Sequence, residues 1–194
     1  MPPFSVLHVC LGNICRSPMA ERLLALRVAE RAGIDADELV LSHSSGIGTW
    51  HTGQRMNGPA ARELRSRGGS DAGFRARHID RGMVEASDVI LVATEEVGEY
   101  VTENYPDAAS RTFGIRHFGR IVEGLDLAEL PSSDGSPEAV YERGVALVAL
   151  ADKHRGDAEP DDLDDPWGGG RAIFAATADD IDASLAPLVT ALLS

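Results

Sequence analysis

Apolar runs of strand length alternate with segments of helical periodicity along most of the chain. The pattern predicts strands over residues 4–9, 39–41, 89–93 and 111–115. It predicts helices over residues 17–31, 59–67, 95–103, 137–153 and 177–192. Such alternation is typical of βαβ units, so we expect an α/β fold in which helices cover both faces of a mostly parallel sheet.

Single residues mark the ends of several predicted helices. Ser17 is expected to cap the first helix, with Pro18 in its first turn, and Gly33 to end it. Thr177 is expected to cap the last helix, in which Pro187 predicts a bend or a break.

The pattern is weakest over residues 117–164. It predicts a single helix there, followed by an acidic stretch over residues 152–165 that is typical of a solvated loop. The sequence therefore predicts little about the path of the chain in this part.

Length and charge narrow the class of protein. The 194 residues fit one domain, and 18 Lys+Arg against 31 Asp+Glu give a net charge of −13. This acidity argues against nucleic-acid binding and requires a local positive site for any anionic ligand.

Because no stretch approaches the roughly 20 apolar residues of a membrane span and the N-terminus lacks signal-peptide features, we expect a cytoplasmic protein without membrane contact. The oligomeric state stays open.

Both cysteines, Cys10 and Cys15, lie in one short loop, which excludes a disulfide framework and directs attention to thiol chemistry. Cys10 ends the first predicted strand, and Arg16 stands where the first helix begins. Ligands of open α/β sheets bind beyond the carboxyl ends of the strands, and amides at a helix N-terminus bind anions. These surroundings favour a thiolate, so Cys10 is predicted to be a nucleophile beside an anion site.

The other residues of this loop suit the same chemistry. Gly12 permits close approach of the backbone, and Asn13 tolerates the left-handed conformation of a tight loop. The planar guanidinium of Arg16 can bind two oxygens of a phosphoryl group. The Ser17 hydroxyl can donate a hydrogen bond to the thiolate.

The loop resembles the signature of the low-molecular-weight protein tyrosine phosphatases over the string Val9-Cys10-Leu11-Gly12-Asn13-Ile14-Cys15-Arg16-Ser17-Pro18. Asp165-Pro166-Trp167 resembles the segment near the C-terminus from which that family supplies its proton donor. Residues 44–50, 74–79 and 86–91 are similar to further parts of the family's sequence. The resemblance implies that residues 1–194 form one domain with a four-stranded parallel sheet and helices on both faces.

The resemblance also implies an activity. It is that of a cysteine phosphatase, without metal or cofactor, that hydrolyses protein phosphotyrosine or small aryl phosphomonoesters through a cysteinyl-phosphate. Cys10 would attack phosphorus, Arg16 would hold the oxygens, and Asp165 would act first as acid and then as base. The substrate-binding residues implied are Leu11, Gly12, Asn13, Ile14, Cys15, Ser17, Trp50 and Trp167. Cys15 is either a redox partner that protects Cys10 or a small core residue.

Three departures from the family pattern limit this transfer. Phe74 stands where better-known members carry a histidine that supports the phosphate loop. Gly168 follows Trp167 where many members have a second aromatic residue. An insertion over roughly residues 120–160 is expected to be a lid, a partner surface or a surface helix.

Two other functions use the same residues. An arsenate reductase could be built on this anion-binding loop, although thiol-cascade versions need a third cysteine. A non-catalytic module could bind phosphoproteins, although binding alone does not require Asp165. The scattered histidines His51, His78, His117 and His154 lack metal-ligand spacing and are predicted to be surface or supporting residues.

Overall fold

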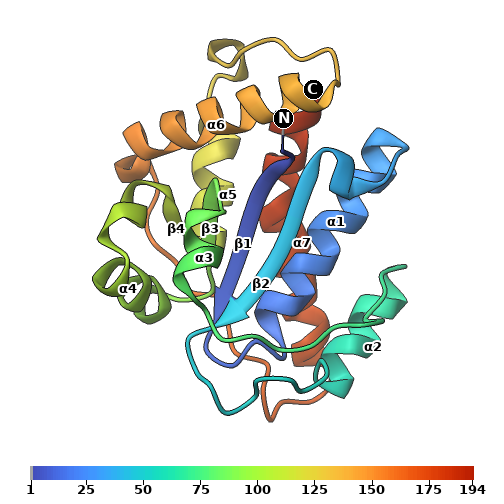
Figure 1. Ribbon diagram of the computed structural model, residues 1–194. Helices are drawn as coiled ribbons and strands as arrows, with labels where there is room; N and C mark the ends of the chain where they lie inside the picture. The colour runs from blue at the N-terminus through green and yellow to red at the C-terminus, as the bar shows by residue number, and fades with distance from the viewer. Residues whose placement is uncertain (1) are drawn as a thin grey trace.

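The computed structural model describes residues 2–194 as a layered α/β structure built on one sheet (Figure 1). All strand pairs are parallel, and the strand order is β2-β1-β3-β4. The strands are β1 (Phe4–Cys10), β2 (Val40–Gly46), β3 (Val89–Val92) and β4 (Thr112–Gly114). The four-stranded parallel sheet expected from the sequence is confirmed.

Helices cover both faces of this sheet. They are α1 (Arg16–Ala32), α2 (Gly58–Ser66), α3 (Arg81–Glu85), α4 (Glu95–Asn104), α5 (Ile115–Gly124), α6 (Pro137–Lys153) and α7 (Arg171–Leu193). Short 3₁₀ helices, η1 (Ala36–Glu38), η2 (Pro106–Arg111), η3 (Leu127–Glu129) and η4 (Arg155–Asp157), connect them. Residues of α1, α5 and α7 form one apolar core on one face, and residues of α3 and α4 form a second core on the other.

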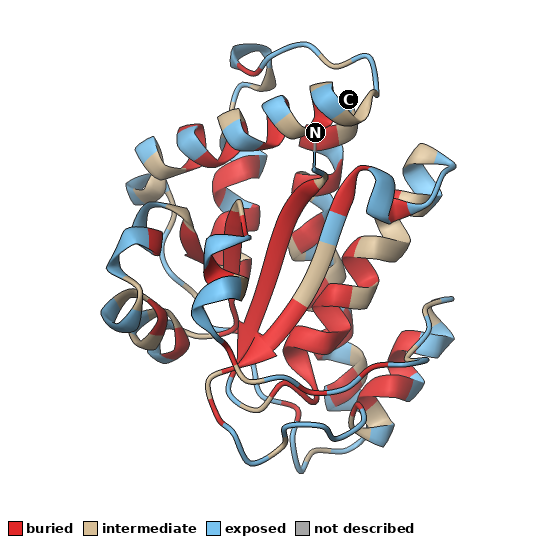
Figure 2. Cartoon of the chain, in the orientation of Figure 1, coloured by how far each residue is buried: buried red, intermediate tan, exposed pale blue. Residues whose placement is uncertain are grey.

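The central strand β1 determines where the site lies. Every residue of β1 is buried, whereas the edge strand β2 is partly exposed (Figure 2). Side chains alternate along a strand, so Phe4 and Val6 join the core under α1, while Leu7 and Val9 join the core under α4. Cys10 is the last residue of β1, so its side chain lies at the carboxyl edge of the sheet on the α1 side.

Two predicted helix caps are wrong. Helix α1 begins at Arg16 after Cys15, and the Ser17 side chain lies inside the first turn, where its oxygen is 3.0 Å from Cys10 Sγ. Helix α7 begins at Arg171, and Thr177 lies in its interior with its hydroxyl donating to the Ile173 carbonyl at 3.0 Å. The Ser17 hydroxyl thus contacts the Cys10 sulfur and the Thr177 hydroxyl binds a carbonyl of its own helix, so neither caps a helix N-terminus. The end of α1 at Gly33, with φ of 72°, is as expected.

The structure contains a helix, α5, that the sequence pattern did not predict. Ile115, Phe118, Ile121 and Val122 are buried along one side of it. Gly119 interrupts that apolar pattern because α5 and α7 approach closely there: a Cβ on Gly119 would lie 2.5 Å from the backbone oxygen of Ser184. α7 itself continues through Pro187 without a break.

The main element of the predicted insertion, α6, lies across the end of the sheet where β1 begins, close to both chain termini (Figure 1). A Cβ on Gly144 of α6 would lie 2.5 Å from the Phe4 ring. Cys10 is at the opposite end of β1, so α6 does not form a lid over the Cys10 loop.

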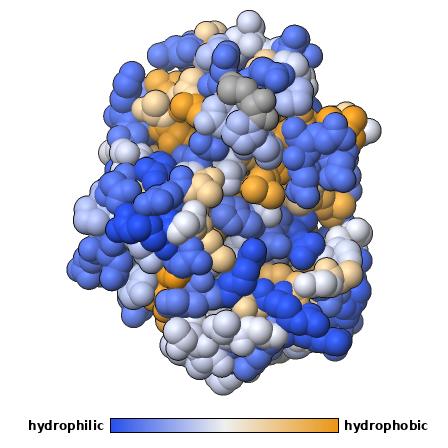
Figure 3. Space-filling model, viewed as in Figure 1, coloured by the Kyte–Doolittle hydropathy of each residue, from blue (hydrophilic) through white to orange (hydrophobic). Residues whose placement is uncertain are grey.

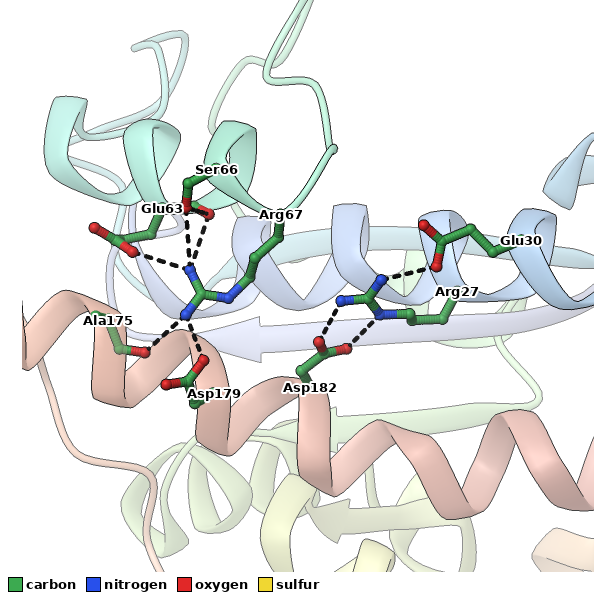
Figure 4. A network of polar contacts seen from close by, with 8 residues as sticks. All are labelled: Arg27, Glu30, Glu63, Ser66, Arg67, Ala175, Asp179 and Asp182. Carbon is green, nitrogen blue, oxygen red and sulfur yellow. Dashed lines mark hydrogen bonds and ion pairs between the residues drawn. The ribbon is translucent and has the colours of Figure 1, made fainter.

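Two arginines join α7 to its neighbours (Figure 4). Arg27 of α1 donates to both carboxylate oxygens of Asp182, from Nε at 2.8 Å, and Arg67 next to α2 pairs with Glu63 at 2.9 Å and with Asp179. The Arg67–Glu63 pair is largely buried, and the partly exposed Arg27–Asp182 pair is bidentate, a geometry that fixes the orientation of α1 against α7. The viewed face of the molecule is mostly polar, with scattered apolar patches (Figure 3). Within residues 2–194, no helix combines the length and apolar composition of a membrane span.

Replacement of Arg143 by methionine is expected to lower the free energy of unfolding by about 2 to 4 kcal/mol. Arg143 of α6 is buried and donates to the carbonyl oxygens of Ala191 and Pro131 and to Ser194 Oγ, so the change leaves buried acceptors unpaired. Urea unfolding measures the loss. Lys153→Met, at an exposed position of the same helix, is the control, and equal effects of the two changes would contradict the argument.

Candidate active site

The loop between β1 and α1 wraps around the Cys10 sulfur. Asn13 adopts the left-handed conformation, with φ of 53°, and its backbone N–H points to Cys10 Sγ at 3.3 Å. Ser17 Oγ lies 3.0 Å from the same sulfur. Two hydrogen-bonding groups and the N-terminus of α1 therefore surround the thiol, an arrangement that stabilises negative charge on sulfur.

Arg16 joins this loop to a segment about 150 residues further along the chain. Its side chain is only 7% exposed, and its guanidinium donates to the Leu163 carbonyl at 3.0 Å and to Asp165 Oδ2 at 2.8 Å. The Asp165 side chain is 46% exposed, and its other oxygen accepts from the Trp167 amide at 3.1 Å. The segment is anchored by Leu163, which is buried and donates its N–H to the Ala93 carbonyl beyond β3 at 2.8 Å.

These groups line a cavity of about 230 Å³ at the carboxyl edge of the sheet. Trp50 and Trp167, 59% and 67% exposed, contribute to its walls. Its lining residues are Cys10, Leu11, Gly12, Ile14, Cys15, Arg16, Trp50, His51, Asp165 and Trp167. Except for Asn13 and Ser17, every site residue predicted from the sequence lines this cavity.

Asn13 and Ser17 lie beneath the loop instead. The buried Asn13 amide donates to Ser17 Oγ and to Ser44 Oγ, both at 2.9 Å, and its oxygen accepts from the Arg77 backbone N–H at 2.7 Å. With all three bonds made inside the protein, the Asn13 side chain holds the loop in shape and does not face the cavity.

A buried carboxyl group continues this support. Ser44 Oγ donates to Glu21 Oε2 at 2.5 Å, and Arg22 and Arg77 lie 3.1 and 3.4 Å from the same carboxyl group. Burial is the main cause that raises the pKa of Glu21, opposed by the Ser44 hydrogen bond and by both arginines. Ser44, Glu21 and the Arg77 backbone thus hold Asn13. Phe74, at the position where the resemblance leads one to expect histidine, packs in the apolar core.

The two cysteines differ in their surroundings. Both are buried free thiols. Burial, followed by the negative charge of Cys10, raises the pKa of Cys15 to about 12, so Cys15 is a neutral thiol at physiological pH. Cys15 therefore does not compete with Cys10 as a nucleophile.

His51, predicted to be a surface or supporting residue, lies in the cavity wall. Its Nδ1 lies 2.9 Å from Gln54 Oε1, which orients the ring. The ring packs on Gly12, where a Cβ would lie 2.9 Å from His51 Cδ2. The available signal was its place directly after Trp50 in a turn that borders the site.

Gly46 was not singled out from the sequence either. A Cβ there would lie 2.9 Å from both the Asn13 nitrogen and the Leu11 oxygen, so only glycine lets the end of β2 lie against the Cys10 loop. Gly46 ends the observed strand β2, beyond the strand predicted over residues 39–41, and a glycine in a strand often marks close backbone approach. Among residues 2–194, no group of three His, Cys, Asp or Glu side chains converges as metal ligands.

A Gly46→Ala change is expected to displace the loop and to weaken the binding of inorganic phosphate about a hundredfold. The contact atoms are backbone, so they cannot yield by a change of rotamer. Calorimetric titration with phosphate measures the effect. Gly58→Ala, where a Cβ meets nothing within 4 Å, should bind like the wild type. Unchanged affinity of Gly46→Ala in a folded protein would show that the loop tolerates the displacement.

The sequence of this chain is similar to a family model and to several known proteins. The family model described as low molecular weight phosphotyrosine protein phosphatase matches residues 5–148. The low molecular weight protein-tyrosine-phosphatase YfkJ of Bacillus subtilis is 34% identical over 66% of this chain and 78% of its own length. The low molecular weight protein-tyrosine-phosphatase of Streptomyces coelicolor is 31% identical over 97% of this chain and 93% of its own.

The fold is also shared with solved structures. The YwlE arginine phosphatase from Geobacillus stearothermophilus aligns over 97% of this chain and 92% of its own, with a TM-score of 0.67 and 22% identity. At that identity the likeness shows the fold alone. Taken with the matched family model and the relatives above, it leaves one conclusion: the chain belongs to the low-molecular-weight protein tyrosine phosphatase family.

Proposed function

We propose that this chain hydrolyses protein phosphotyrosine and small aryl phosphomonoesters through a cysteinyl-phosphate on Cys10. The observation that carries the proposal is the convergence, around one cavity, of the Cys10 sulfur, the Arg16 guanidinium and the Asp165 carboxyl group. Nucleophile, anion ligand and proton donor are the three groups that phosphomonoester hydrolysis requires in the absence of a metal.

The first step transfers the phosphoryl group to sulfur. Cys10 attacks phosphorus in line, the bond from phosphorus to the aryl oxygen breaks, and Asp165 donates its proton to that oxygen. The loop amides and Arg16 bind the equatorial oxygens, where negative charge develops. The Ser17 hydroxyl, 3.0 Å from Cys10 Sγ, stabilises the thiolate before attack.

The second step regenerates the enzyme. Asp165, now a carboxylate, takes a proton from a water molecule that attacks phosphorus, and the bond from phosphorus to Cys10 sulfur breaks. Inorganic phosphate leaves, and once Asp165 has released its proton to solvent, its carboxylate pairs with Arg16 again at 2.8 Å.

The cavity walls support an aryl substrate. Exposed tryptophan side chains at positions 50 and 167 offer apolar faces on which a phenyl ring can stack. With Gly168 after Trp167, one wall carries a single aromatic residue, so aryl phosphates besides phosphotyrosine can also enter. The free thiols Cys10 and Cys15 suit a reducing, cytoplasmic setting, in which Cys15 can form a reversible disulfide that protects Cys10.

Metal-free hydrolysis of an aryl phosphate tests the proposal. Cys10→Ser should abolish turnover, because the serine hydroxyl is a far weaker nucleophile than a thiolate. Asp165→Asn should lower kcat about a hundredfold through loss of the proton donor. Asp164→Asn, an exposed carboxyl group next in the chain, is the matched control and should keep normal kcat. Full activity of Cys10→Ser would overturn the proposal.

The same preparations separate the other candidate functions. A phosphotyrosine peptide should be cleaved faster than a phosphoarginine peptide. Arsenate-dependent consumption of thiol would favour an arsenate reductase. Tight binding of phosphopeptide without turnover by the wild type would favour a non-catalytic binding module.

Alkylation by iodoacetate at pH 7 is expected to modify Cys10 and to spare Cys15. The reason is that burial raises the pKa of Cys15 to about 12, so its reactive thiolate appears only as the pH approaches that value. Mass spectrometry of peptides measures the labels. Inorganic phosphate should protect Cys10, and Cys15→Ser should leave the labelling of Cys10 in place. Equal labelling of both cysteines at pH 7 would contradict the assignment.

A further inference from the structure

His8 is a buried polar residue directly beneath the active site. It lies two residues before Cys10 on β1, so its side chain is on the same face of the sheet, under the first turn of α1. The residue is 1% exposed, and its Nε2 lies 3.1 Å from Ser42 Oγ on the neighbouring strand β2. Within residues 2–194, its Nδ1 has no hydrogen-bond partner.

The ring of His8 is neutral under ordinary conditions. Burial, with a smaller contribution from His43, lowers the pKa of His8 to about 3. A neutral imidazole has one N–H and one free lone pair. If Nε2–H donates to Ser42, the lone pair on Nδ1 must accept a hydrogen bond or stay unsatisfied in the interior, which is costly.

A small cavity of about 10 Å³ adjoins His8 on the side of β3. Its lining comes from β1, α1, α5, the end of β3 and the segment at Leu163, and none of it comes from β2, whereas Nε2 is engaged toward β2. This leaves Nδ1 as the ring nitrogen available to the cavity. Besides His8, the polar residues that line it are Arg16 and Ser17. The volume is about that of one water molecule measured by the same kind of probe.

We propose that one buried water molecule occupies this cavity, donates a hydrogen bond to His8 Nδ1 and accepts one from the Arg16 guanidinium. His8 is thereby a positioning residue for Arg16, acting through this water. The Ser17 oxygen is already engaged by Asn13 and Cys10, so Arg16 is the lining residue with donors to spare. Arg16 has five N–H donors, and Leu163 and Asp165 together accept two hydrogen bonds from them.

The link matters most when substrate is bound, and in this it rests on the proposed function. In the structure Asp165 helps to fix Arg16. A bound phosphoryl group draws the guanidinium toward its own oxygens, and Asp165 turns to the leaving group. The Leu163 carbonyl and the bridge to His8 then remain as the anchors of Arg16 inside the protein, and they hold it in the orientation that the transition state requires.

Crystal structures of the wild type with and without inorganic phosphate test the water directly. Ordered density within hydrogen-bonding distance of both His8 Nδ1 and Arg16 is expected in each. A dry cavity, or a direct contact between His8 and Arg16 without water, would overturn the bridge.

Variants test the positioning role. His8→Phe removes the acceptor while keeping a planar ring, and we expect kcat to fall and the inhibition constant of phosphate to rise, each about tenfold. His8→Gln keeps a polar group that can hold the water, so it should restore both values to within about threefold of wild type. If His8→Phe fails to fold, His8→Gln and the crystal structures still decide the question.

His43→Phe is the matched control. The pKa of His43 is lowered too, to about 4, but this histidine is only partly buried, contacts Ser5 and Ser87 and does not line the cavity. It should lower thermal stability without changing phosphate inhibition. Equal loss of phosphate affinity in His43→Phe and His8→Phe would show a general structural effect and refute the role of His8. An inactive wild type with the water in place would instead refute the proposed function alone.

Discussion

The buried guanidinium of Arg16 is the interaction on which the rest of the site depends. A charged side chain that is 7% exposed needs hydrogen-bond acceptors, and Arg16 finds them in Leu163 and Asp165, far along the chain. Because Leu163 is itself tied to Ala93 beyond β3, the hydrogen bonds of Arg16 hold the segment that carries Asp165 at the edge of the sheet. The same hydrogen bonds thus satisfy the buried charge of Arg16 and bring Asp165 to the cavity.

The Cys10 loop is shaped mainly from below. Asn13 takes a left-handed backbone conformation that is costly for most residues, and its side chain makes three internal hydrogen bonds that offset this cost. Ser44 and Glu21 continue the network into α1. Such a fully bonded polar layer keeps the amides aimed at the anion site before any ligand arrives, which is the preorganisation that electrostatic catalysis requires.

The sequence predicted most of this site because its residues are adjacent in the chain or belong to short motifs. The cavity residues of the Cys10 loop and Trp167 could be named in this way, as could the four parallel strands. Long-range packing could not be named: Gly119 hides the helical pattern of α5 because α7 crosses there, and Gly46 matters only through contact with a loop more than 30 residues away. His51 lacked any spacing pattern, and its place directly after Trp50 was the one sign in the sequence that it lies near the cavity.

The net negative charge of the chain and the local positive charge of the cavity act on an anionic ligand at different distances. At −13 overall, the protein repels a phosphorylated ligand at long range, so attraction must act at short range, inside a cavity where Arg16 and backbone amides are shielded from water. Two exposed tryptophans at its walls add apolar contacts to the binding of a ligand, and the negative net charge does not weaken these contacts. A ligand that offers both a phosphoryl group and an aromatic ring meets both requirements at once, whereas inorganic phosphate meets only the first. The proposed preference for aryl phosphates is therefore compatible with a net charge that disfavours anions at long range.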